Sequence, residues 1–249
     1  MWCSIKSLCT VVCSLACGLV LTARADAAPA FEDSIAQRTL ACTACHGDQG
    51  RAGPDGYYPR LAGKPAGYLY NQLLNFRDGR RHYGLMTHMV DVLSDAYLFE
   101  IASHFASLQV PYPPPAPPAQ RPAPEVLQRG RTLALQGDAA QRLPACADCH
   151  GRALMGAQTH FPALLGLPAD YLTAQLGGWK TGQRRAASPD CMARVAERLS
   201  DADAHAVVSW LASQPVPAHT QAADARPASR PLAADLRCGS APVPTGPSR

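Results

Sequence analysis

The chain has 249 residues, a formal net charge of +4 at pH 7 and only 17% charged residues. It contains no basic run and no basic face interleaved with aromatic residues, which argues against a nucleic-acid-binding protein. The length suits one or two domains, and an aromatic content of only 6% is consistent with a core that a large flat cofactor helps to fill.

Residues 1–25 have the features of a secretory signal peptide. Lys6 precedes an apolar stretch that ends at Leu21 and is too short to span a bilayer comfortably. The small-x-small sequence that ends at Ala25 fits a cleavage site. We therefore expect export to the periplasm, with an uncleaved leader that serves as a membrane anchor as the alternative.

A pentapeptide of the form Cys-x-x-Cys-His occurs once in each half of the chain, as Cys42-Thr-Ala-Cys45-His46 and as Cys146-Ala-Asp-Cys149-His150. This pattern is the attachment signal for c-type haem. The two thiols add to the haem vinyl groups as thioethers, and the following His reaches the iron from one side. The sequence therefore predicts two covalently bound haem groups per chain.

Two other uses of paired cysteines agree less well with the sequence. Zinc ribbons place their Cys pairs about 15–20 residues apart, whereas here the pairs lie in different halves, each with its own His. A thioredoxin-like redox motif needs a βαβ context, and no segment alternates convincingly as a strand.

The two halves share a repeat that is longer than the pentapeptide. Residues 68–79 match residues 171–182, and Leu-Ser-Asp-Ala occurs at 93–96 and again at 199–202. A proline-rich stretch between the copies favours polyproline II, which acts as a semi-rigid spacer. The expected organisation is a first domain at 26–109, a Pro-rich linker at 110–122, a second domain at 123–214 and a Pro/Ala-rich tail at 215–249.

Each half is expected to be helical, so the predicted fold class is all-α, with two tandem domains. Ser94 and Ser200 are N-cap residues followed by an acidic residue in the first turn, and apolar residues recur every three or four positions after Ser94. The expected helices are 34–44, 66–76 and one after Ser94 in the first half, and 123–136, 169–179 and one after Ser200 in the second.

Each iron needs a second axial ligand, and the sequence favours Met86 and Met192. Each Met precedes the Ser of its N-cap by the same number of residues, whereas the counterpart of Met89 is Val195. A Met ligand raises the reduction potential, a second His lowers it, and an open site permits ligand chemistry. We expect one His and one Met on each iron, with Met89 as the alternative in the first half.

Two prolines are candidates for orienting the ligating histidines. A ligating His usually donates its other ring N–H to a backbone carbonyl or carboxylate. Pro59 and Pro162 follow their haem motifs at nearly the same spacing. Their carbonyl groups are the predicted acceptors, with ordinary turn prolines as the alternative.

Cys191 and Cys238 are the two cysteines outside both the leader and the haem motifs. Two such thiols usually pair in an oxidising compartment. We expect a disulfide that holds the tail beside Met192, with two unpaired thiols as the alternative.

The pairs Arg80-Arg81 and Arg184-Arg185 occupy similar places in the two halves. They are interpreted as solvated surface residues, with an ion pair to a haem propionate as the alternative.

The chain resembles the dihaem cytochrome c4 family over about residues 34 to 214. The resemblance is carried by the doubled haem motif, Tyr58-Pro59-Arg60-Leu61-Ala62-Gly63, the Gln72 helix that ends at Phe76-Arg77-Asp78-Gly79, and Met86 before Leu93-Ser94-Asp95. It implies two class I cytochrome c folds with low-spin, His/Met-ligated haems in contact near their propionates. The Pro-rich linker and the Cys-containing tail depart from the family pattern.

The resemblance implies a periplasmic electron carrier rather than an enzyme. The implied donor is a quinol-oxidising complex or a dehydrogenase, and the implied acceptor is a terminal oxidase. The alternatives are a dihaem redox enzyme of the peroxidase or thiosulfate-oxidising type, and a dedicated cytochrome subunit of a membrane dehydrogenase. A Met in each half argues for irons with both axial positions filled, and therefore for outer-sphere electron transfer. The mature protein is expected to be soluble or loosely membrane-associated.

Overall fold

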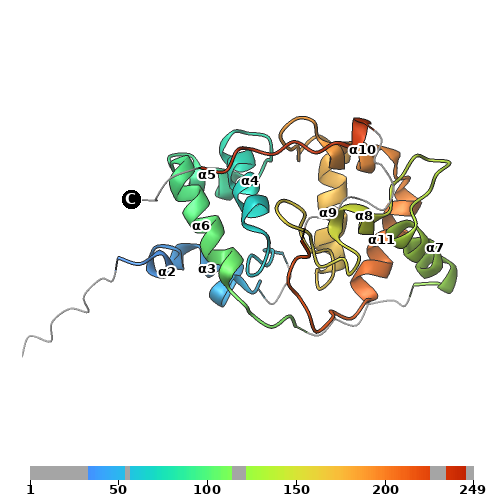
Figure 1. The fold of residues 1–249 in the computed structure, drawn as a ribbon, viewed down its shortest axis with the longest axis horizontal. Coiled ribbons are helices and arrows are strands. Elements are labelled where there is room, and N and C mark those ends of the chain that lie inside the picture. The colour runs from blue at the N-terminus through green and yellow to red at the C-terminus, as the bar shows by residue number, and fades with distance from the viewer. Residues whose placement is uncertain (1–32, 54–56, 114–121, 225–233, 245–249) are drawn as a thin grey trace, which may run out of the picture. The chain divides into compact units, whose positions relative to one another are not determined.

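The computed structural model describes residues 33–53, 57–113, 122–224 and 234–244. In these ranges the regular secondary structure is helical, and β pairing is limited to isolated bridges. The helices gather in two groups, called here the first domain (α2–α6) and the second domain (α7–α11) (Figure 1). The chain is therefore all-α with two tandem domains, as predicted.

The first domain contains α2 (Ile35–Arg38), α3 (Leu40–His46), α4 (Ala66–Arg77), α5 (Gly84–Val90) and α6 (Asp95–Ser107), with a 3-10 turn at Asp48–Gly50. The prediction of a single helix at 34–44 was wrong, because the helix is interrupted at Thr39, between α2 and α3. The Thr39 hydroxyl donates to the carbonyls of Ile35 at 2.8 Å and Ala36 at 3.1 Å. Such bonds from Thr to the preceding turn bend helices.

The second domain contains α7 (Pro124–Leu135), α8 (Cys146–His150), α9 (Ala169–Lys180), α10 (Cys191–Arg198) and α11 (Asp201–Ser213). A short 3-10 turn, η2 (Ala234–Leu236), lies in the tail. The sequence did not predict α5 or α10, because segments of seven and eight residues are too short for helical periodicity to show.

Both predicted serine N-caps are present. Ser94 Oγ accepts from the Tyr97 N–H at 3.3 Å, and Ser200 Oγ accepts from the Asp203 N–H at 3.0 Å. The apolar stripe of α6 packs on α4 in the core of the first domain, which is formed by Leu69, Tyr70, Leu74, Phe76, Val90, Leu98, Ile101, Ala102 and Phe105.

The second domain is built around the crossing of α7 and α11. Gly130 permits this crossing, since a Cβ atom there would lie 2.0 Å from the Ala206 carbonyl oxygen. A glycine lets two backbones approach this closely because it has no side chain to displace. The core beside the crossing includes Leu133, Leu143, Leu154, Met155, Leu165, Leu172, Leu199, Val207, Val208, Trp210 and Leu211.

At the beginning of the Pro-rich linker, Val110 is buried and Tyr112 is half-buried, whereas Pro111 and Pro113 are exposed. Arg60 is only 4% exposed, and its Nε donates to the Ala62 carbonyl at 3.0 Å. Its Nη1 donates to the Pro111 carbonyl at 3.2 Å, and its guanidinium lies 3.9 Å from the centre of the Tyr112 ring. Arg60 therefore fixes the linker where it leaves the first domain, while residues 114–121 lie outside the described part.

The tail runs from α10 in the second domain toward α4 and α5 in the first (Figure 1). The Gly239 N–H donates to the Pro189 carbonyl at 2.7 Å, and the Ala241 N–H donates to Asn71 Oδ1 of α4 at 2.9 Å. One short segment therefore contacts both domains.

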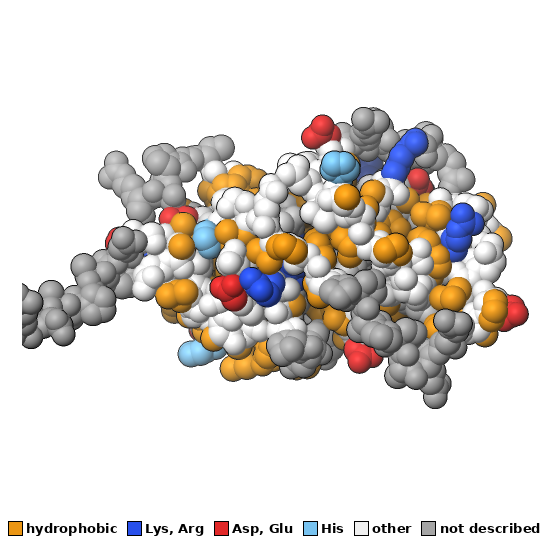
Figure 2. Space-filling view, turned by 90° about the horizontal axis from the view of Figure 1, so that it is seen from below, with side chains coloured by type: hydrophobic (Ala, Val, Ile, Leu, Met, Phe, Trp, Pro, Cys, Tyr) orange, Lys and Arg blue, Asp and Glu red, His pale blue; other side chains and the backbone are white. Residues whose placement is uncertain are grey.

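Charged side chains are scattered on the face shown in Figure 2, with hydrophobic side chains interspersed between them. No helix in the described ranges is both long and apolar enough to cross a membrane. The predicted leader at 1–25 lies outside those ranges.

Candidate functional site

One cavity in the first domain brings together the residues predicted to bind haem there. Its lining includes Cys42, Cys45, His46, Pro59, Leu61 and Met86. The cysteines and His46 come from α3, and Met86 comes from α5. The alternative ligand Met89 also lines this cavity, but 45% of it is exposed.

A second cavity brings together the corresponding residues of the second domain. Its lining includes Cys146, Cys149, His150, Pro162, Leu164 and Met192. The cysteines and His150 form α8, and Met192 lies in the first turn of α10. In both domains, therefore, a helix that ends in His and a short helix that carries Met contribute to one cavity.

The two histidines are held in the same way. The Nδ1 atom of His46 lies 2.8 Å from the Pro59 carbonyl oxygen, and that of His150 lies 2.8 Å from the Pro162 carbonyl oxygen. A carbonyl only accepts, so each Nδ1 carries the proton and each Nε2 lone pair is available to a metal. Burial lowers the pKa of both rings and keeps them neutral, which is the state that binds metal.

A glycine after each His turns the chain back along the cavity. Gly47 has φ 74° and Gly151 has φ 82°, values that favour glycine. A Cβ atom at Gly47 would lie 2.3 Å from the Ala52 carbonyl oxygen, and one at Gly151 would lie 2.6 Å from that of Gly156. These glycines end α3 and α8 directly after the ligand and start the loop that returns to the proline.

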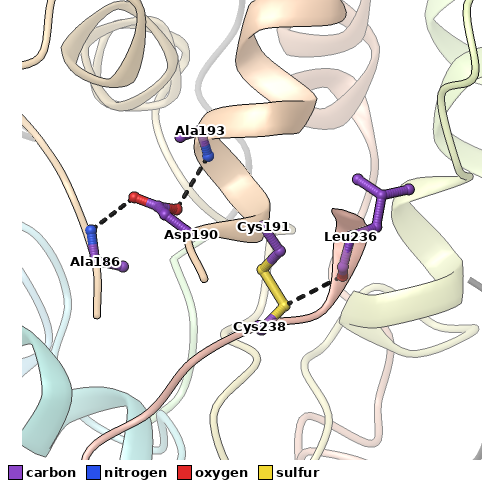
Figure 3. Close-up of a disulfide and its surroundings, with 6 residues drawn as sticks. All are labelled: Ala186, Asp190, Cys191, Ala193, Leu236 and Cys238. Carbon is purple, nitrogen blue, oxygen red and sulfur yellow. Dashed lines mark hydrogen bonds between the residues drawn. A yellow bond between two sulfur atoms is a disulfide. The ribbon is translucent and has the colours of Figure 1, made fainter. Parts of the chain in front are cut away.

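A disulfide lies at the start of α10 (Figure 3), where Met192 is the next residue along the chain after Cys191. Cys191 opens α10 and is joined to Cys238 of the tail, with the sulfur atoms 2.02 Å apart. Asp190 caps the same helix, because its carboxylate accepts from the Ala193 N–H at 3.0 Å and from the Ala186 N–H at 2.7 Å.

Between the two cavities lies a cluster of cationic side chains. Lys64 and Arg184 line both cavities and are only 4% and 6% exposed, and Arg81 lines the first. In the described ranges, no Asp or Glu forms a salt bridge with any of the three. The interpretation of Arg184 as a solvated surface residue was therefore wrong, because it is buried between the domains.

The two arginines are linked through a pair of glutamines with approximate twofold symmetry. Arg81 donates to Gln72 Oε1 at 3.0 Å and to Gln175 Oε1 at 2.7 Å. Arg184 donates to Gln175 Oε1 at 2.7 Å and to Gln72 Oε1 at 3.1 Å. Sequence reasoning missed the role of these glutamines, although the repeat aligns Gln72 with Gln175.

The electrostatics of this cluster favour an anionic group. Burial raises the pKa of Tyr68, but Arg184, Arg81 and Lys64 outweigh burial and lower the pKa to about 8. Trp179 lines the second cavity, and its Nε1 is the one buried side-chain polar atom of the described residues without a hydrogen-bond partner. A haem presents two carboxylates at one edge, so these groups would suit the propionates of haems held at His46 and His150.

The comparisons with known proteins agree with this geometry. Residues 127–215 match the family model described as Cytochrome c. The chain is 40% identical over 190 residues to the thiosulfate dehydrogenase electron acceptor of Thiomonas intermedia, and the match covers 76% of this chain and 86% of that protein.

Two solved structures are also similar. Reduced recombinant cytochrome c4 from Pseudomonas stutzeri matches with a TM-score of 0.60 and 31% identity, over 72% of this chain and 95% of that one. Thiosulfate dehydrogenase from Marichromatium purpuratum matches with a TM-score of 0.59 and 34% identity, over 70% of this chain but only 36% of that longer chain.

Sequence, fold and cavity geometry thus agree on the cofactor and the class of protein. There are two Cys-x-x-Cys-His sites, each in its own helical domain, and the similar proteins that match over most of their own length include a cytochrome c4. The chain therefore belongs to the cytochrome c4 family and is an electron carrier with two covalent haem c groups, each with His and Met ligands.

Proposed function

We propose that this chain accepts electrons in the periplasm from a thiosulfate-oxidising dehydrogenase and passes them to a terminal oxidase. The relative from Thiomonas intermedia, named for accepting electrons from thiosulfate dehydrogenase, supports the donor. The observation that carries the proposal is that each cavity is lined by both a His and a Met. This pair indicates an iron with both axial positions filled, which suits outer-sphere electron transfer.

We assign His46 with Met86 to the first iron, and His150 with Met192 to the second. Met89 is the weaker candidate because its counterpart in the repeat is Val195, which has no metal-binding atom. When bound, the haem supplies one-electron redox chemistry, and the protein tunes it through the axial ligands and the polarity of the surroundings.

The cationic cluster between the cavities has a structural role in this assignment. The haem carboxylates would be held by Lys64, Arg81 and Arg184. These carboxylates would supply the negative charge that the cationic cluster lacks in the protein alone. The glutamine pair cross-links the two arginines and so fixes the two sites relative to each other. Fixed ligands and a fixed separation keep the reorganisation that accompanies each electron small.

The test is stopped-flow reduction of the oxidised holoprotein. With thiosulfate and catalytic thiosulfate dehydrogenase, we expect both haems to become reduced, whereas thiosulfate alone should reduce neither. Reduction by thiosulfate alone would show that the chain is itself a thiosulfate-oxidising enzyme. Reduction by a quinol-oxidising complex but not by the dehydrogenase would overturn the assigned donor.

A further inference from the structure

One short segment of the tail, residues 235–239, holds both ends of α10. At the first residue of the helix, Cys191 is joined to Cys238 by the disulfide. At the last residue, Arg198 forms an ion pair with Asp235. We call this segment the tail clamp, because a helix of eight residues that is fixed at both ends cannot swing away without breaking one of these contacts.

The tail clamp also forms part of the wall of the second haem cavity. Cys238 and Gly239 line this cavity together with Met192. The Gly239 N–H donates to the Pro189 carbonyl at 2.7 Å, and a Cβ atom at Gly239 would lie 2.4 Å from the Ser188 carbonyl oxygen. The backbone of the clamp therefore lies directly against the loop that leads into α10.

The helix that carries Met86 in the first domain has no such clamp. Among the described residues, none of the tail lines the first haem cavity, and none of α5 takes part in a disulfide or a salt bridge. The N-cap of α5 is Tyr83, which makes no side-chain capping bond. The two methionines are therefore presented by helices of similar length with very different restraints.

These restraints bear on how easily each Met leaves its iron. A protein segment opens locally at a free energy that depends on the contacts it must break. Opening of α10 breaks the contacts of the clamp, whereas opening of α5 does not. A neutral thioether is a soft ligand that favours ferrous iron, so the difference should be seen most clearly in the oxidised protein.

We propose that the tail clamp is a positioning element that keeps Met192 on the second iron. In the oxidised protein, an external ligand for iron therefore displaces Met86 before Met192. In each exchange the bond from iron to the Met sulfur breaks and a bond from iron to the incoming ligand forms, with no electron or proton transferred when that ligand is neutral. The inference rests on the proposed function, which assigns these two methionines as ligands.

The test mixes the oxidised holoprotein with imidazole and follows the loss of the red-end absorption band of Met–iron ligation. Once the rate no longer rises with imidazole concentration, it reports how fast Met leaves the iron. Met86→His leaves this band to the second haem alone, and Met192→His leaves it to the first. We expect Met86 to leave about tenfold faster than Met192, equivalent to about 1.4 kcal/mol.

Loss of the disulfide should remove most of this difference. Cys191→Ser combined with Cys238→Ser breaks the covalent contact and leaves no free thiol in the cavity to compete for the iron. In the Met86→His protein, this double change should raise the rate at which Met192 leaves by about tenfold. In the Met192→His protein, the same change should leave the rate for Met86 unaltered.

A second variant weakens the clamp and keeps the disulfide. Asp235→Ala removes the ion pair at the far end of α10, and it should raise the rate for Met192 about threefold, because a partly exposed ion pair contributes less than a disulfide. Glu125→Ala is the matched control, since it removes an exposed carboxylate of α7 that lines neither cavity. Its rate should equal that of the parent protein.

Three results would overturn the proposal. One is an equal rate of loss for Met86 and Met192, and another is a rate for Met192 that neither the double Cys variant nor Asp235→Ala changes. The third is a rise for Met86 as large as that for Met192, which would mean that the tail acts through the contact between domains. Failure of thiosulfate dehydrogenase to reduce the wild-type protein would refute the proposed donor and would leave these exchange rates as they are, so the two failures are distinguishable.

Discussion

The helices that present Met86 and Met192 differ in how they are anchored. In the second domain, α10 begins at the Asp190 cap and is held to the tail by a disulfide and an ion pair. In the first domain, α5 begins after Tyr83 without a side-chain cap, although Thr87 Oγ1 donates to the Phe76 carbonyl at 3.3 Å. The repeat therefore places Met86 and Met192 at equivalent positions, while the anchoring of the helix that carries each Met differs between the domains.

A second difference concerns the contact between the first and last helices of each domain. In the second domain, Arg129 Nε donates to the Asp203 carboxylate at 2.7 Å. In the first domain, the residue equivalent to Asp203 is Tyr97. The Arg38 guanidinium lies 6.0 Å from the centre of the Tyr97 ring and forms an ion pair with Glu100 of α6 at 3.6 Å. The second domain thus has a short ion pair at this contact, where the first has a longer ion pair together with a cation–π contact.

Exchange of the ligands themselves is expected to have the largest effect. Met86→His and Met192→His should each lower the potential of one haem by on the order of 100 mV, a part of the about 0.8 V range that axial ligands span. Each variant should also remove about half of the red-end absorption band of Met–iron ligation in the oxidised protein. A redox titration followed by absorption measures both quantities.

Met89→Leu is the matched control for the first domain, because it removes a neighbouring thioether on the same helix. It should leave the band at full strength. Loss of half the band in Met89→Leu, together with a normal band in Met86→His, would reassign the ligand of the first haem to Met89.

Loss of the tail disulfide should have the next largest effect, and it should affect the second domain more than the first. Cys238→Ser removes a disulfide between residues that are 47 positions apart in the sequence. Disulfides that close loops of this kind typically contribute about 2–4 kcal/mol to the free energy of unfolding. Calorimetry of the holoprotein should show the transition of the second domain at lower temperature, with little change for the first.

Ser240→Ala is the control for the disulfide, since it changes the tail without breaking the bond. Reduction of the wild-type protein with a dithiol should reproduce the behaviour of Cys238→Ser. Equal shifts in both domains would mean that the tail stabilises the contact between them rather than α10 alone.

The sequence offered specific candidates for the ligands but gave less information about their surroundings. Met86 and Met192 could be predicted as ligands because each precedes the Ser of its N-cap by the same number of residues. The short helices α5 and α10 could not be predicted, because they span too few residues for a periodic pattern. The burial of Arg184 was also hidden, since it depends on the contact between domains, which no local pattern of residues reports.

The smallest expected effect tests the difference between Asp203 and Tyr97. Hydrogen bonds from Arg129 are the main cause that lowers the pKa of the Asp203 carboxyl, against the opposing effect of burial. A lowered folded-state pKa means that this carboxylate stabilises the fold above its unfolded pKa of about 3.9, and that the stabilisation is lost as the pH falls below that value.

Asp203→Asn should therefore destabilise the second domain by about 1 kcal/mol at neutral pH, the size expected for a partly buried ion pair. The difference from the wild type should shrink as the pH falls through about 4 and below, because protonation then removes the same charge from the wild type. The first domain has Tyr97 rather than a carboxylate at this position. A constant difference at all pH values would mean that Asp203 acts through packing and neutral hydrogen bonds, and that the contrast between the two helix contacts is not electrostatic.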